Sequence, residues 1–301
     1  MADSQEKARI RVGVAGWYYP DWQGIVYPAA GKDAIDRLRY LAGFVDVIEI
    51  NNTFYRPPDV SDVADWCARV ADVEGFVFTV KLWQRFTHHR DEQWSRQELV
   101  DFLRRVRPVF ESGPGGALLV QFPHSFHRIS ENEAYLRELL LQLEGVPVVV
   151  EVRHYTWGSP DALAMLEELG AGACSIDQPM FRGSLGPLET VTGDIGYIRL
   201  HGRNKKNWFK GDVGRDARYD YLYSKEELAP WVQRALRMAE KSRDVYVIAN
   251  NHFHGQAVCN ALMVKASLTG ARVRTPASLL EKFPLLKDYA DPDAPVQEML
   301  F

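Results

Sequence analysis

The chain has 301 residues, 46% hydrophobic and 25% charged, and its formal net charge of −4 at pH 7 excludes a globally basic nucleic-acid binder. No apolar run approaches the roughly 18 residues of a membrane-spanning helix, and the polar start MADSQEKARIR lacks the apolar core of a secretory signal, so no membrane association is expected. Its three cysteines, Cys67, Cys174 and Cys259, are odd in number and lack CxxC spacing, which favours a reducing cytoplasm.

Short apolar runs that end in polar residues recur eight times, and most are separated by a segment of helical period. They are Ile10–Gly16, Val45–Ile50, Phe76–Lys81, Ala117–Gln121, Pro147–Arg153, Ala173–Asp177, Ile195–His201 and Val245–Asn250. This alternation predicts an α/β fold, a single-domain (β/α)8 barrel of the TIM type over residues 10–270. An open doubly wound sheet is the alternative. Residues 1–9 are expected to form a flexible tail, and residues 271–301 an extension that packs outside the barrel.

Helical period and capping residues predict the segments between the strands. The expected helices are Lys32–Gly43, Asp59–Ala71, Trp94–Phe110, Ile129–Leu143, Ser159–Gly170, Lys225–Ser242 and Gln256–Leu268. Ser130 with Glu133, and Ser224 with Glu227, have the spacing of capping boxes. Residues 178–194 contain Gly and Pro but no helical period. The helix between the sixth and seventh strands is therefore expected to be irregular or missing.

Residues suited to line a pocket follow the first two predicted strands. Trp17 and Tyr18 belong to an aromatic segment that is either a hydrophobic plug on the barrel mouth or a stacking wall for a ring. Glu49 stands at the tip of the second strand, where a carboxylate is buried only when it is paired, and Asn51 and Tyr55 follow it. Polar groups at the C-terminal ends of barrel strands indicate a catalytic site.

The later strands end in further candidates. Lys81 either binds an anion, acts as a base after desolvation lowers its pKa, or forms a surface salt bridge. His88 is the one of two adjacent histidines expected to face the pocket. Glu151 and Arg153 share one side of their strand by alternation and form either part of the site or a structural ion pair, with Trp157 behind them. The other polar tips are Gln121, Asp177, Arg199, His201, Asn250 and Asn251.

Seven motifs in one order resemble the YecE-like family, known as domain of unknown function 72 (DUF72), over roughly residues 11–268. They are GVAGWYYPDW, FVDVIEINNTFYRPP, FTVKLWQRFTHH, LLVQFPHSF, VEVRHYTW, YIRLHGRN with RYDYLYS, and ANNHFHGQAVCNA. The resemblance implies a TIM-barrel-like fold with an open pocket at one end, and no agreed reaction. The motif residues that carry over are the site candidates named above, together with Phe54 and Gly202.

The first functional hypothesis is an enzyme that uses acid and base catalysis on a small polar or anionic substrate, phosphorylated or sugar-like, as a hydrolase, lyase or isomerase. Unequal surroundings can separate the pKa values of two carboxylates, so Glu49 and Glu151 are the candidate acid and base. The candidate catalytic residues are Glu49, Glu151, His201, Lys81 and Asp177. The candidate substrate-binding residues are Trp17, Tyr18, Asn51, Tyr55, His88, Gln121, Arg153, Trp157, Arg199, Asn250 and Asn251.

The second hypothesis is metal-assisted phosphodiesterase or nuclease-like chemistry, which would need a divalent metal as cofactor. Its ligands would be Glu49, Glu151, Asp177 and His201. No HExxH or HxH motif supports it. No other cofactor is indicated, because GxGxxG and Walker-type loops are missing from the sequence.

The third hypothesis is a non-catalytic binder of nucleic acid or another ligand through residues 202–223. This stretch has six basic and three acidic residues interleaved with aromatics, a combination suited to an anionic ligand or a nucleic-acid strand. It predicts salt-sensitive binding that is lost when Lys205, Lys206 and Lys210 become Ala and is indifferent to Glu49→Gln. The first hypothesis predicts the reverse.

Overall fold

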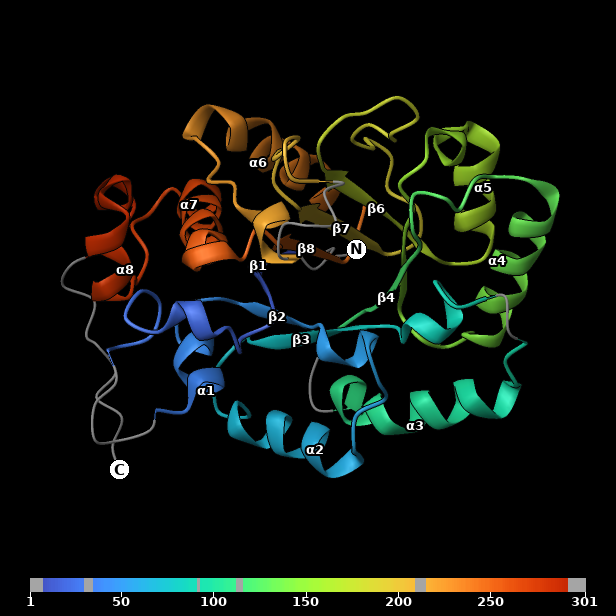
Figure 1. Cartoon of the computed structure of the whole chain (residues 1–301), viewed down its shortest axis with the longest axis horizontal. Helices are drawn as coiled ribbons and strands as arrows, with labels where there is room; N and C mark the ends of the chain where they lie inside the picture. Colours follow the sequence, from blue (N-terminus) through green and yellow to red (C-terminus); the bar gives the residue numbers. More distant parts are fainter. Residues whose placement is uncertain (1–7, 30–34, 91–92, 112–115, 209–214, 292–301) are drawn as a thin grey trace, which may run out of the picture.

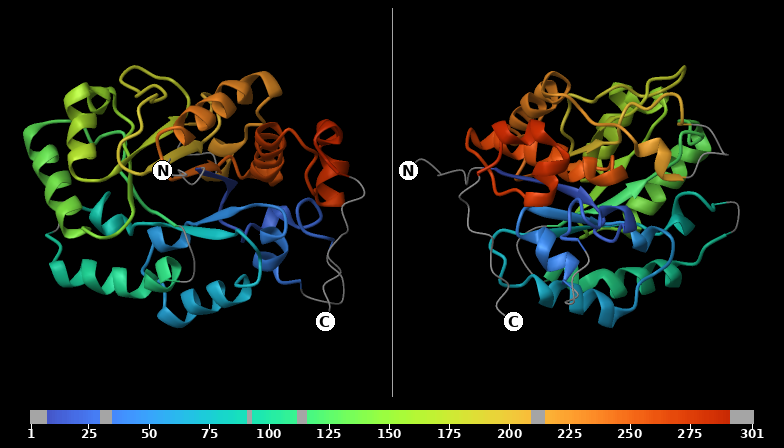
Figure 2. Two further views of the ribbon diagram at one scale, coloured as in Figure 1. Left: turned by 180° about the vertical axis from the view of Figure 1, so that it is seen from behind. Right: turned by 60° about the vertical axis from the view of Figure 1, so that its left-hand side comes forward.

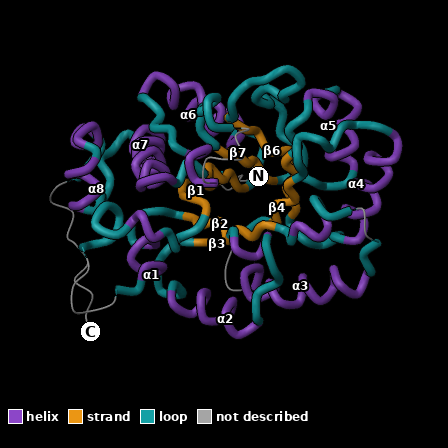
Figure 3. Tube along the Cα trace, viewed as in Figure 1, coloured by secondary structure: helices purple, strands orange, loops and turns teal. Residues whose placement is uncertain are grey.

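Eight parallel strands form a closed barrel in sequence order, as Figures 1 and 3 show. The structure is a computed structural model that describes residues 8–29, 35–90, 93–111, 116–208 and 215–291. The strands are β1 Arg9–Ala15, β2 Val47–Ile50, β3 Val77–Lys81, β4 Leu118–Gln121, β5 Val148–Glu151, β6 Gly172–Asp177, β7 Ile195–Leu200 and β8 Asp244–Ala249. The pairing of β1 with β8, from Arg9 opposite Asp244 to Val14 opposite Ala249, closes the ring. The prediction of an eight-stranded TIM-like barrel is confirmed.

Helices surround the barrel on its outside (Figure 2). They are α1 Arg37–Ala42, α2 Val60–Arg69, α3 Arg96–Glu111, α4 Ser130–Gln142, α5 Pro160–Glu168, α6 Lys225–Ala239, α7 Gln256–Thr269 and α8 Ala277–Lys282. Residues 178–194, all within the described part of the chain, form turns and irregular structure between β6 and β7. The missing helix of the prediction is therefore confirmed. α1 begins at Arg37, and the first residues of the helix expected from Lys32 lie outside the described residues.

Side-chain alternation divides the core into an inner and an outer layer. Val47, Leu119, Val149, Ile176 and Ile248 belong to a buried cluster inside the barrel. Their strand neighbours, among them Ile48 and Val150, belong to a larger cluster that the helices cover. Because successive side chains on a strand point to opposite faces, the residue two positions after an inner residue also points inward. The inner positions at the C-terminal ends of the strands are therefore the place where polar tips can meet.

Of the two predicted capping boxes, the one at Ser224 is present, and the prediction at Ser130 is wrong. Ser224 caps α6, accepting a hydrogen bond from the Glu227 backbone while Glu227 binds the Ser224 backbone. In α4, Ser130 is already the first helical residue and Ile129 is the cap, without a side-chain bond. The Glu133 carboxylate accepts a hydrogen bond from Arg128 Nε at 2.7 Å, in an ion pair with the preceding loop.

The residues after α7 pack beside that helix, outside the strands (Figure 1). Leu279 of α8 and Leu286 of the 3-10 helix Pro284–Asp288 are fully buried and belong to the outer core cluster. Residues 1–7 of the expected tail and residues 292–301 of the expected extension lie outside the described residues. Among the helices of the described chain, none combines the length and apolar character needed to cross a membrane.

Candidate active site

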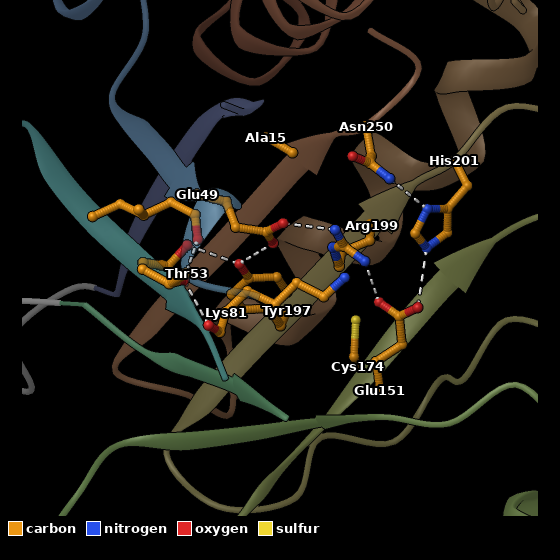
Figure 4. Close-up of polar contacts among 12 residues, drawn as sticks. Ala15, Glu49, Thr53, Lys81, Glu151, Cys174, Tyr197, Arg199, His201 and Asn250 are labelled. Carbon is orange, nitrogen blue, oxygen red and sulfur yellow. Dashed lines mark hydrogen bonds and ion pairs between the residues drawn. The ribbon is translucent and has the colours of Figure 1, made fainter. Parts of the chain in front are cut away.

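A single guanidinium joins two carboxylates inside the C-terminal end of the barrel. Glu49, Glu151 and Arg199 occupy inner positions of β2, β5 and β7, each two residues beyond an inner-layer residue. Arg199 donates to Glu49 Oε1 at 2.6 Å and to Glu151 Oε2 at 2.5 Å. All three side chains are at most 1% exposed. Figure 4 shows the guanidinium between the two carboxylates, which come from β2 and β5.

Neutral and charged partners occupy the remaining carboxylate oxygens. Tyr197, two residues before Arg199, donates its hydroxyl to Glu49 Oε2 at 2.9 Å. Arg153 donates to Glu151 Oε1 at 2.9 Å from Nε and at 2.8 Å from a terminal nitrogen. His201 Nε2 lies 3.2 Å from the same oxygen. Both carboxylates are therefore held as hydrogen-bond acceptors in a network that joins β2, β5 and β7.

The network fixes the protonation of its members. Burial alone would raise the pKa of Glu151, but the charges of Arg199 and Arg153 hold that pKa well below its usual range. Burial lowers the pKa of His201 to about 3, with the Arg153 charge acting in the same direction. The imidazole is therefore neutral at pH 7. Because Asn250 Nδ2 lies 2.9 Å from His201 Nδ1 as its donor, the ring proton belongs on Nε2, where it faces Glu151.

A cavity of about 360 Å³ lies above this network. Arg199 and Arg153 contribute to its wall, whereas neither Glu49 nor Glu151 does. Aromatic side chains make up much of the rest, and of the predicted residues the wall includes Trp17, Tyr18, Asn51, Tyr55, Lys81, Gln121, Arg153, Arg199 and Asn250. An arginine-lined bottom and aromatic sides suit a small ligand with a negative charge and a flat or ring-shaped body.

Lys81 is the unusual member of the wall. It is 9% exposed, and its Nζ lies 3.8 Å from the centre of the Phe54 ring. Within the described residues its Nζ has no hydrogen bond or ion pair, since Arg199 and Arg153 take the nearby carboxylates. Burial, and next the charge of Arg199, lower the pKa of Lys81 to about 7. The alternative that Lys81 forms a surface salt bridge is therefore not found among the described residues.

Four further predicted residues do not line the cavity. Trp157 is 1% exposed, stacks on the Phe126 ring and donates its indole N–H to the Phe126 carbonyl at 2.7 Å. Asn251 is fully buried and binds the Tyr221 carbonyl and Asn260. Asp177 accepts from Arg203 Nε at 2.9 Å, and burial raises its pKa. The His88 ring packs edge-on against Phe54, and burial lowers its pKa to about 4.

The described part of the 202–223 stretch turns its aromatic rings inward. Tyr223 is fully buried, and its hydroxyl accepts from the Gly202 backbone at 2.8 Å. Tyr219 contributes to the cavity wall, and the Trp208 ring lies 6.0 Å from the Arg153 guanidinium. Lys205 and Lys206 are exposed, and Lys210 lies outside the described residues. Tyr219 is therefore part of the cavity wall, and the described rings are not displayed together as a surface for stacking bases.

Some site residues were missed by the sequence interpretation. His252 lines the cavity and stacks between Tyr19, at 4.4 Å between ring centres, and Tyr219, at 4.8 Å. A signal for Tyr19 and His252 was available, because each lies two residues beyond a chosen candidate, Trp17 and Asn250. Tyr197 gave no such signal, since a tyrosine in the middle of a strand is most often simply packed in the core.

The candidate ligands of the metal hypothesis already bind other side chains. Glu49 and Glu151 are each bound to Arg199, and Asp177 is bound to Arg203. His201 turns its Nε2 toward Glu151 and its Nδ1 toward Asn250. Across the described ranges no three His, Cys, Asp or Glu side chains are grouped as a metal ion would require. A divalent cation at this place would have to displace a guanidinium, so these residues do not fit the cofactor.

The fold and the site together define a TIM-type barrel protein with a polar cavity at the C-terminal ends of its strands, the place where barrel enzymes carry their active sites. The family model described as "Protein of unknown function DUF72" matches residues 11–282. The chain belongs to this family.

Three relatives illustrate the similarity. The UPF0759 protein YunF of Bacillus subtilis is 29% identical over 264 residues, which cover 83% of this chain and 92% of YunF. The crystal structure of the DUF72 family protein TM1631 from Thermotoga maritima is 30% identical, with a TM-score of 0.77 over 87% of this chain and 99% of that one. A structure of the DUF72 family protein EF0366 from Enterococcus faecalis is 25% identical, with a TM-score of 0.72 over 87% and 98% of the two chains.

Proposed function

We propose that this protein is an enzyme that performs acid and base catalysis on a small anionic substrate, phosphorylated or sugar-like, bound in the cavity at the C-terminal ends of the strands. The observation that carries the proposal is Lys81, a buried amine on the cavity wall without a carboxylate partner among the described residues. With a pKa of about 7 it exists in both protonation states at neutral pH. A group of this kind can both accept and return a proton.

The proposal changes the roles that the sequence suggested for the two glutamates. Glu49 and Glu151 are covered, and their oxygens are occupied by Arg199, Arg153 and Tyr197. Their function is then to position the guanidinium groups. Arg153 is the group placed to bind the anion, because its side chain remains 16% exposed and it lines the cavity. Lys81 replaces the carboxylates as the acid and base.

The aromatic sides of the cavity fit the remainder of such a substrate. Trp17 is packed edge-on against Trp66, with ring centres 5.3 Å apart, so its position in the wall is fixed. Tyr55 is 52% exposed at the rim. Flat rings with polar edges bind the apolar face of a sugar while leaving its hydroxyl groups to hydrogen-bonding side chains. Asn51 has a buried side-chain oxygen for which the described residues supply no hydrogen-bond partner, and this suits a hydroxyl donor.

The test begins with the intact protein and a panel of sugar phosphates, sugar acids and uncharged sugars, scored by the rise in melting temperature. A ligand at a hundred times its Kd adds about 2.7 kcal/mol to the free energy of unfolding. We expect anionic compounds to raise the melting temperature and uncharged sugars to leave it unchanged. Compounds that bind are then followed for turnover by NMR.

Matched variants connect the result to the cavity. Lys81→Met is expected to lower kcat roughly 10²- to 10⁴-fold, the usual contribution of an acid or base. Arg153→Gln is expected mainly to raise KM. Arg104→Gln, at an exposed arginine on α3, is the control for loss of an arginine. Anion binding or turnover that survives unchanged in both cavity variants would show that the site is elsewhere.

Cys67, Cys174 and Cys259 are buried, and no disulfide joins any two of them, which supports the cytoplasm as the compartment in which we propose the protein works.

A further inference from the structure

Lys81 has the surroundings of a nucleophile as well as those of a base. Its side chain comes from the last residue of β3 and runs toward the Arg199 guanidinium, as Figure 4 shows. One face of its Nζ is covered by the Phe54 ring at 3.8 Å. Nearby carboxylates already bind arginine. An amine that is desolvated and placed among other cations loses its proton readily, and the free amine attacks carbonyl carbon.

The backbone of Lys81 is anchored, so its side chain starts from a fixed point on the cavity wall. Thr53, which is fully buried, donates its hydroxyl to the Lys81 carbonyl at 2.7 Å. The Leu82 backbone N–H binds the Leu119 carbonyl at 2.9 Å on the neighbouring strand. Arg153 lines the same cavity with its guanidinium tied to Glu151. The wall therefore offers a positioned amine and a positioned anion-binding group together.

We propose that Lys81 forms an imine with a carbonyl substrate whose carboxylate or phosphate is bound by Arg153. The proposal rests on the proposed function, and it narrows the substrate class to 2-oxo acids or phosphorylated aldehydes and ketones. The lone pair of the neutral amine forms the N–C bond, and the carbonyl π electrons move to oxygen, which takes up a proton. The resulting carbinolamine loses water and leaves a C=N bond at Nζ. Amine and carbonyl give imine and water, with no oxidation or reduction.

The fraction of neutral amine explains why this lysine would react before others. A lysine with the reference pKa of about 10.4 has only about one neutral amine in 2,500 at pH 7. A pKa of about 7 makes half of the Lys81 amines neutral. The ratio of the two fractions is about a thousandfold, and binding of the anion beside the amine adds the advantage of proximity.

Reductive trapping on the intact protein tests the proposal. Pyruvate and glyceraldehyde 3-phosphate serve as separate probes at pH 7 with cyanoborohydride, and the modified lysine is located by peptide mass spectrometry. We expect one adduct per chain, at Lys81, formed at least about a hundredfold faster than at the exposed Lys241. Reaction with pyruvate alone would assign a carboxylate to the anion site, and reaction with the phosphate probe alone would assign a phosphate.

Variants distinguish imine formation at a specific site from the general reactivity of lysine side chains. Lys81→Arg keeps a cation in the cavity and should abolish the fast adduct, whereas Lys241→Arg should leave it unchanged. Arg153→Gln should slow trapping of pyruvate about tenfold or more but not trapping of acetone, which has no anionic group. Far-ultraviolet circular dichroism establishes that each variant is folded.

Two outcomes would overturn the imine, and they are distinct from failure of the proposed function. Trapping at Lys81 no faster than at Lys241, with both probes, in a folded protein would exclude it. So would fast trapping that persists in Lys81→Arg. If the anion panel still binds and Lys81→Met still abolishes turnover, Lys81 is an acid and base without covalent chemistry. Loss of anion dependence in that panel would overturn the proposed function itself.

Discussion

The barrel has a buried ion cluster at each end, and the two clusters differ in how their charges are balanced. At the N-terminal end Asp244 is 1% exposed and binds Arg11 at 2.6 Å, Arg243 at 2.9 Å and Arg9 at 3.2 Å. Two of those arginines, Arg9 and Arg243, expose 38% and 62% of their side chains. Water therefore balances the excess positive charge there. This cluster ties β1 to β8 where the ring closes.

At the C-terminal end the excess positive charge is largely shielded from solvent. Glu49 and Glu151 face Arg199, Arg153 and Lys81, and the least buried of these, Arg153, exposes only 16% of its side chain. With both carboxylates bound to guanidinium groups, the remaining cation faces a cavity. The comparison teaches that a buried ion pair by itself indicates closure of the fold. A buried cation beside a cavity, without a carboxylate partner among the described residues, is the observation on which the proposed function rests.

The largest effect is expected where the two-carboxylate cluster is broken. Arg199→Met leaves Glu49 with only a tyrosine hydroxyl among the partners described here, while Glu151 keeps Arg153. We expect the free energy of unfolding in urea to fall by about 3–5 kcal/mol, because a buried charge is left without its partner. Adding Glu49→Gln to Arg199→Met removes that charge and should restore part of the loss. No recovery in the double variant would mean that the loss comes from packing and not from charge.

A second effect concerns the pH dependence of stability. The pKa of Lys81 falls from 10.5 to about 7 on folding, so between these pH values the unfolded chain binds one more proton than the folded chain. Stability due to this group therefore rises with pH across that window, by about 1.4 kcal/mol per pH unit. The free energy of unfolding in urea is measured for the wild type and for Lys81→Met at each pH, and the difference between the two isolates the effect. If the difference in the free energy of unfolding between wild type and Lys81→Met did not change between pH 7 and 10, the lowered pKa of Lys81 would be contradicted.

A smaller effect is expected at the opposite end of the barrel. Arg11→Met removes the shortest contact of Asp244 but leaves Arg9 and Arg243. We expect a loss of about 1–2 kcal/mol in the free energy of unfolding, below that of Arg199→Met, because the carboxylate keeps hydrogen-bonding partners. Cavity ligands should bind with unchanged affinity. An equal loss for Arg11→Met and Arg199→Met would remove the distinction between the two clusters.

The smallest effect belongs to the exposed rim of that N-terminal cluster. Arg243→Gln removes a guanidinium that is 62% exposed, and exposed ion pairs contribute little in water. We expect a change below about 0.5 kcal/mol, measured by urea unfolding at low and at high salt. A loss that approaches that of Arg11→Met would show that Asp244 depends on all three arginines together.

Much of the fold was predictable because it depends on local patterns. Short apolar runs such as Val45–Ile50, repeated between helical segments, predict buried strands. The spacing of Ser224 and Glu227 predicts a capping box, and that capping box forms. The Gly- and Pro-containing stretch 178–194 has no helical period and forms no helix. The cap expected at Ser130 does not form, because the helix begins at that residue with Ile129 as its cap. The spacing of serine and glutamate does not decide at which residue the helix begins.

The sequence by itself determined which strands end in acids, bases and amides, since a polar residue at the end of a buried run is visible in the residue order. Only the tertiary structure decided which of them are paired. Arg199 binds Glu49 across 150 positions of the chain and Glu151 across 48, and this leaves Lys81, beside the cavity, without a carboxylate partner among the described residues. The physical reason is that ionic partners are selected by distance across the closed ring, which no local period encodes. The same geometry buried Trp157 on Phe126 and brought His252 to the cavity wall.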